Sequence, residues 1–146
     1  MHSKSGLIFS GDDKTVLFVQ QVCDTLDVNL ASIHDMNAFL LRIMEDEFVF
    51  LLFDCTGLEN FGLSWIKLVR QMRPKFPLIV LSDDVDQEAG GRILEEGIFY
   101  LAIRPFQSDI FSQVLKAALE QHNSQVLHSW RIKECSKGTN NSCWLV

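Results

Sequence analysis

The segment at residues 48–53 reads FVFLLF and is the clearest strand in the sequence, and it ends abruptly at Asp54. A strand with one face in water alternates apolar and polar residues, whereas an unbroken apolar run indicates a strand that is covered on both faces. Strands of that kind lie in the middle of parallel sheets. The run therefore predicts a central parallel strand with an acidic residue at its carboxyl end.

Strand and helix patterns alternate on both sides of this run. Further strands are predicted at residues 7–10, 28–33, 78–81 and 100–103, and helices at residues 14–26, 37–44, 63–72 and 87–96 and from residue 108 onward. Asp13 is the predicted N-cap of the first helix, and Gly97 is the residue that ends the fourth. Five βα units in this order predict an α/β fold with one doubly wound five-stranded parallel sheet, (βα)5, and helices on both faces.

Composition narrows the class of protein. The chain has 146 residues, 47% of them hydrophobic and 22% charged, which is typical of a single globular domain. Its net charge of −6 argues against direct nucleic-acid binding, which needs clustered cations. No apolar stretch is long enough to span a membrane, and the first residues lack the pattern of a signal peptide, so we expect a cytoplasmic protein. The four cysteines have no metal-ligand spacing and are expected to be free thiols.

Polar residues follow four of the predicted strands, at the edge where doubly wound sheets bind their ligands. These residues are Asp12, Asp54, Ser82 and Arg104. Two carboxylates at neighbouring strand ends suit Mg²⁺, and a carboxylate can act as a nucleophile toward a phosphoryl donor. A hydroxyl and a fixed positive charge can stabilise the transferring oxygens. We interpret the following acids, at residues 83 and 84, as a solvated loop.

These residues give the chain a resemblance to response-regulator receiver domains, over residues 7–122. Asp54 falls at the phosphoacceptor position, Gly62-Leu63 at the Gly-Leu of the third helix, Ser82 at the Ser/Thr position, Gly97 at the family glycine and Arg104-Pro105-Phe106 at the Lys-Pro-Phe. The resemblance implies a flavodoxin-like fold and a signalling role, not that of an enzyme. It also implies Mg²⁺ held by Asp12, Asp54 and the backbone carbonyl of Thr56.

The resemblance also implies partners. A histidine kinase or phosphotransfer protein would donate the phosphoryl group to Asp54, and Ser82 and Arg104 would respond to it. The switched face, made by the fourth helix and the fifth strand, would bind a partner or form a homodimer. A downstream output domain would be absent from this chain. Residues 1–123 are predicted to form the receiver domain, and residues 124–146 a C-terminal helical extension or a flexible tail.

The sequence departs from the family pattern at the acidic pair that follows the first strand. When the following helix is aligned, Gly11 replaces the first acid and Asp12 alone remains to hold metal. A shift by one residue would restore the pair as Asp12-Asp13, but it would lengthen the strand and use up the helix cap. We favour the unshifted alignment.

Three further departures support an alternative function. Leu58 stands where a proline is usual, Leu101 at the aromatic switch position, and Arg104 in place of the family lysine. Arginine keeps the charge but is planar and larger, so it could clamp two phosphoryl oxygens or form a permanent ion pair with the acids. The second outcome gives a pseudo-receiver, a protein-interaction module that is not phosphorylated. A nucleotide-binding or flavodoxin-like enzyme ranks last, because no glycine-rich phosphate loop follows the first strand.

Overall fold

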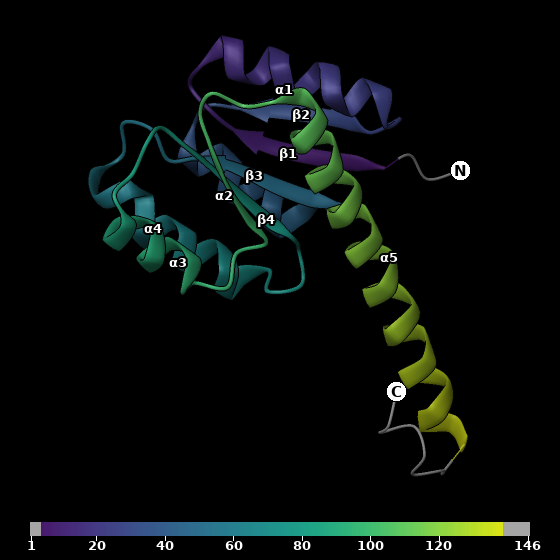
Figure 1. The fold of residues 1–146 in the computed structure, drawn as a ribbon. Helices are drawn as coiled ribbons and strands as arrows, with labels where there is room; N and C mark the ends of the chain where they lie inside the picture. The colour runs from purple at the N-terminus through teal and green to yellow at the C-terminus, as the bar shows by residue number, and fades with distance from the viewer. Residues whose placement is uncertain (1–3, 139–146) are drawn as a thin grey trace.

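Five parallel strands form one sheet, and five α-helices of the described chain cover its two faces (Figure 1). The computed structural model describes residues 4–138, with side chains described as far as residue 123. The strands are β1 (Ser5–Phe9), β2 (Asn29–Ile33), β3 (Phe50–Asp54), β4 (Leu78–Ser82) and β5 (Tyr100–Ile103). The helices are α1 (Asp13–Thr25), α2 (Met36–Glu45), the 3-10 turn η1 (Glu59–Gly62), α3 (Leu63–Met72), α4 (Gln87–Leu94) and α5 (Ser108–Gly138).

The strand order β2-β1-β3-β4-β5 makes β3 the central strand, as the sequence predicts. All four neighbouring pairs are parallel, so their carboxyl ends lie along one edge of the sheet. The chain moves outward from β1 to β2 and then returns past β1 to β3. The order of the strands therefore reverses between β1 and β3, which is where doubly wound sheets place their binding crevice.

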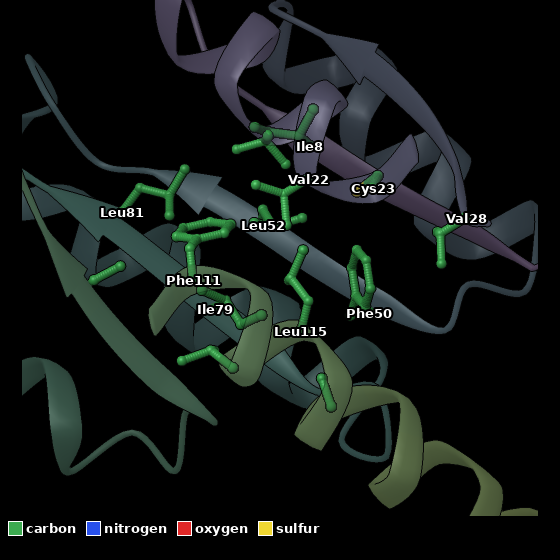
Figure 2. Close-up of a cluster of buried hydrophobic side chains, with 14 of the residues drawn as sticks. Ile8, Val22, Cys23, Val28, Phe50, Leu52, Ile79, Leu81, Phe111 and Leu115 are labelled. Carbon is green, nitrogen blue, oxygen red and sulfur yellow. The ribbon is translucent and has the colours of Figure 1, made fainter. Parts of the chain in front are cut away.

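The side chains of β3 are divided between two hydrophobic cores because successive residues of a strand point to opposite faces. Phe50 and Leu52 join a core against α1 and α5, shown in Figure 2. Leu51 and Phe53 join the core against α2, α3 and α4. All four side chains are fully buried. This explains the unbroken apolar run of the sequence and confirms the doubly wound fold.

The start of α1 corrects one expectation. The N-cap is Asp12 and not Asp13, which is the first residue of the helix itself. The carboxylate of Asp12 accepts a hydrogen bond from the backbone N–H of Lys14. Both acids are common N-caps, so the sequence alone did not decide between them. The side chain of Asp12 is therefore engaged in capping the start of α1.

The C-terminal helix α5 is longer than the domain needs. Its first turns pack on the core through Phe111, Val114 and Leu115, and the helix then continues to Gly138, away from the sheet (Figure 1). Residues 124–138 are therefore helical, while residues 139–146 of the predicted extension or tail lie outside the described residues. Between residues 4 and 138, no helix combines the length and the apolarity that crossing a bilayer requires.

Candidate functional site at the carboxyl edge of the sheet

Asp54 is the last residue of β3 and the centre of a polar cluster. Its side chain is 4% exposed and yet both carboxylate oxygens have partners. Oδ2 accepts hydrogen bonds from Ser10 Oγ and from Arg104 Nη2, each at 2.7 Å. Oδ1 accepts a bond of 3.1 Å from the backbone N–H of Thr56. The structure thus brings the predicted residues Asp54, Thr56 and Arg104 together.

Arg104 follows β5, and its backbone N–H donates to the carbonyl of Ser82 at the end of β4. Its guanidinium extends across the carboxyl edge of the sheet. Besides Asp54, it donates to Thr15 Oγ1 at 2.9 Å and to Thr56 Oγ1 at 2.8 Å. We call this set of contacts, with Asp54, Thr15 and Thr56, the Arg104 clasp. A lysine ammonium is a compact charge and could not span these three acceptors in one plane.

The Arg104 clasp also approaches the loop after β4. Nη1 lies 3.5 Å from Oδ1 of Asp83, whose carboxylate is largely exposed. The sequence predicts that this acid lies in a solvated loop, and the structure places it at the rim of the site. At this distance and exposure the ion pair contributes little compared with the buried pair of Arg104 and Asp54.

Asp12, which is predicted to share a metal with Asp54, is linked to the cluster through Thr15. Its carboxylate accepts a 2.7 Å hydrogen bond from Thr15 Oγ1 and caps α1. These bonds, above all the one from Thr15, lower the pKa of Asp12 below its ordinary value. The residue that reaches Asp54 from the first strand is Ser10, because the register pairs Phe9 with Phe53 and so places the next residues side by side.

Ser82 lies at the end of β4 and is 3% exposed, but its hydroxyl is used locally. It donates to the backbone carbonyl of Asp83 at 2.8 Å. Burial raises the pKa of the neighbouring Cys55 thiol, and the nearby Ser82 partly offsets that rise. Ser82 is therefore near the site without being directed at the carboxylate of Asp54. The raised pKa of Cys55 is what a buried free thiol shows, and it keeps the thiol protonated.

Asp54 and Asp12 are carboxylates of the kind that Mg²⁺ prefers, but in this structure both accept hydrogen bonds from groups of the protein. Among the residues whose side chains are described, no three His, Cys, Asp or Glu side chains gather as metal ligands would. Asp54, the one buried carboxylate of residues 4–123, already accepts from three donors, one of them a guanidinium. The guanidinium of Arg104, 2.7 Å from Asp54 Oδ2, also repels a divalent cation at this carboxylate. Arg104 thus supplies, as the sequence predicts, a fixed positive charge beside Asp54.

Two residues of the site were missed by sequence reasoning, namely Ser10 and Thr15. Ser10 is 3% exposed and Thr15 is 4% exposed, and both hydroxyls face the cluster. A signal was present for each. Ser10 directly follows an apolar strand, as Asp54 does, and Thr15 stands three residues after the capping acid, where a side chain can reach back to it.

Comparison with known proteins identifies the fold. Neither a protein-family model nor a curated protein matches the sequence. The structure matches a response-regulator receiver domain from Methanospirillum hungatei JF-1 at 17% identity and a TM-score of 0.75, covering 85% of this chain and 99% of that one. An orphan response regulator of H. pylori matches at 11% identity and a TM-score of 0.71, covering 80% and 97%. The chain has the receiver fold.

The receiver fold also occurs as part of longer proteins. NtrX from Brucella abortus, solved in complex with ADP, matches at 17% identity and a TM-score of 0.75 over 88% of this chain and 30% of that one. At such identities the likeness defines the fold. The chemistry of the site therefore rests on the residues of this chain, and above all on Ser10, Asp54 and Arg104.

Proposed function

We propose that this chain is a pseudo-receiver, a protein-interaction module of receiver fold whose Asp54 is held unphosphorylated by Arg104. The observation that carries the proposal is the double engagement of Asp54 Oδ2, which accepts from Ser10 and from Arg104 at 2.7 Å each. A carboxylate acts as a nucleophile through its oxygen lone pairs. Here three donors use three of its roughly four lone-pair directions, and Arg104 is paired with Oδ2.

The ion pair supports a permanent state more than a transient one. Asp54 is 4% exposed and the side chain of Arg104 is 21% exposed, so water screens the pair poorly. If Arg104 moved away from Asp54, the buried carboxylate would be left without its cation, which costs free energy. The position of Ser10 points the same way, because its hydroxyl lies beside Asp54, where a carboxylate could have helped to hold a metal.

The mass of the intact protein after incubation with Mg²⁺ and a small phosphodonor tests the proposal. We expect no added phosphoryl group on the wild type, and none on an Asp54→Asn control. A Ser10→Asp/Arg104→Lys variant provides the matched comparison, since it replaces the clasp with a carboxylate and a compact ammonium. A gain of one phosphoryl group in that variant alone would support the proposal. A gain in the wild type that is absent from the Asp54→Asn control would refute it.

The second candidate is a working receiver that accepts a phosphoryl group on Asp54 from a histidine kinase or phosphotransfer protein. The position of Asp54 at the carboxyl end of the central strand, two residues before Thr56 and beside the end of β4, favours it. It would require Arg104 to leave Asp54 and a cation to be recruited. In this case we expect the wild type to gain mass in the same experiment and to bind partners, an output domain or a second copy differently afterwards.

A further inference from the structure

The guanidinium of Arg104 lies next to an aromatic ring. Its Cζ atom lies 5.1 Å from the centroid of the Phe106 ring, two residues along the chain. That distance is within the range of a cation–π contact, in which the ring face attracts a cation. The N–H groups of Arg104 donate to other residues, namely Asp54, Thr15 and Thr56, so the ring does not replace any of these hydrogen bonds. Phe106 therefore holds Arg104 without competing with Asp54.

The ring of Phe106 is itself fixed by two others. Its centroid lies 5.8 Å from that of Phe18 on α1 and 5.4 Å from that of Phe111 on α5. Phe18 and Phe111 also meet, edge to face, at 5.3 Å. Separations of this size are favourable for aromatic pairs. The three rings form an aromatic cluster whose position depends on how α5 packs against α1.

The edge of the guanidinium is fixed by two hydroxyls. Thr15 accepts from Nη2 and Thr56 accepts from Nη1, at 2.9 and 2.8 Å. A planar group that has a ring beside it and a bonded hydroxyl on each terminal nitrogen has little freedom to rotate. Its contact with Asp54 then follows from the position in which the ring and the hydroxyls hold it.

We propose that Phe106 is a positioning residue for Arg104 and that, through Arg104, it controls access to Asp54. The inference rests on the proposed function, in which Arg104 closes the site. It goes further by naming what keeps the site closed. A movement of α5 against α1 displaces Phe106, loosens the guanidinium and exposes the carboxylate of Asp54.

Chemical labelling of carboxylates measures this access. A water-soluble carbodiimide with an amine labels exposed acids, and peptide masses give the rate at each site. We expect Asp54 to be protected in the wild type relative to exposed Asp84. Phe106→Leu should raise the rate at Asp54 by roughly three- to fivefold, the factor that matches a cation–π contact at a partly exposed site. Phe106→Tyr, which keeps the ring face, should restore protection.

The matched control is Phe18→Leu. It removes the ring of Phe18 from the same cluster. The described aromatic contacts of that ring are with Phe106 and Phe111, whereas Arg104 lies over Phe106. We expect its Asp54 to stay nearly as protected as in the wild type. Equal rates in Phe18→Leu and Phe106→Leu would overturn the inference, because loosened packing would then explain both.

A second measurement does not depend on any variant's folding. In the wild type, the ring of Phe106 should shift the NMR resonances of the Arg104 side chain upfield, and the Nη protons should exchange slowly. Ordinary, fast-exchanging Arg104 signals would overturn the inference. Neither measurement involves phosphorylation. A wild type that accepts a phosphoryl group would therefore refute the pseudo-receiver and leave the role of Phe106 to be decided by these data.

Discussion

The ion pair of Asp54 and Arg104 makes a prediction about stability at the scale of single residues. Arg104→Met keeps most of the side-chain volume but leaves a buried carboxylate without its cation. We expect the free energy of unfolding to fall by about 2–3 kcal/mol, slightly below the range for fully buried pairs because Arg104 is 21% exposed. Urea titration followed by circular dichroism measures the change.

The control for this experiment is Arg92→Met, which breaks the exposed i,i+4 pair of Arg92 with Glu88 on α4. Exposed pairs contribute little, so we expect a loss of about 0.5 kcal/mol or less. Adding Asp54→Asn to Arg104→Met should recover part of the stability, since no buried charge is then left. Equal losses in the two single variants would show that the buried pair has no special role.

A second prediction at this scale concerns acid. The pKa of Asp12 is below its ordinary value of 3.8, mainly because Thr15 donates to its carboxylate. A lowered pKa in the folded state adds stability above pH 3.8, and this stability is lost as the pH falls through the folded pKa. We expect the stability difference between wild type and Asp12→Asn to shrink as the pH falls below 3.8. A difference that stays constant with pH would contradict this assignment.

How much of the site the sequence could predict is decided by the geometry of strand ends. Asp54 and Arg104 were found because an acid and a cation each follow an apolar strand. Ser10 was missed because Asp12, two residues later, is an acid and so a more obvious metal ligand. The strand register shows that Ser10 is the residue beside Asp54. Side-chain direction at a helix cap depends on hydrogen bonds that a single sequence does not reveal.

At the scale of elements, the order of strands and helices was predictable and their ends were less so. The apolar run placed β3 correctly, but the strand begins at Phe50 and includes Asp54. Phe48 is buried in the core against α2, α3 and α4 without belonging to the strand. Burial and strand pairing are different properties, and hydrophobicity reports the first of them. No helix or strand was predicted between the third strand and the third helix, where η1 forms. Two residues of η1, Asn60 and Phe61, have left-handed backbone conformations.

Two glycines near α4 predict opposite effects of one substitution. Gly91 lies inside the helix, and a Cβ added there meets nothing within 4 Å. Gly91→Ala should therefore raise the free energy of unfolding by about 0.5–1 kcal/mol, because alanine favours helix. Gly97 has a φ of +76°, in the left-handed region. Gly97→Ala should lower the stability by about 1 kcal/mol.

Thermal and urea unfolding of the two variants, compared with wild type, measure these effects. Each variant controls for the other, since both add one methyl group to the same part of the chain. A loss of stability in Gly91→Ala would mean that α4 needs a backbone freedom that its helical conformation does not show.

At the scale of the whole molecule, the sheet separates two cores that share the strands. Leu115 on α5 and Ile66 on α3 are both fully buried, one on each face. Because β3 contributes side chains to both cores, neither face can be lost without exposing residues of the central strand. The domain should therefore unfold in one cooperative transition, as small single domains commonly do.

Leu115→Ala and Ile66→Ala test that unity. Each should cost about 2–4 kcal/mol, because each leaves a cavity in a packed core. In the double variant the losses should add to within about 0.5 kcal/mol, since the two sites share no partner across the sheet. Urea titration followed by circular dichroism gives the energies, and hydrogen exchange shows whether α3 and α5 open together. Leu17→Ala, at an exposed position of α1, provides the surface control. If Leu115→Ala opened α5 and α1 while α3 stayed protected, the two cores would be separate units, and the aromatic cluster could then expose Asp54 without unfolding the other face.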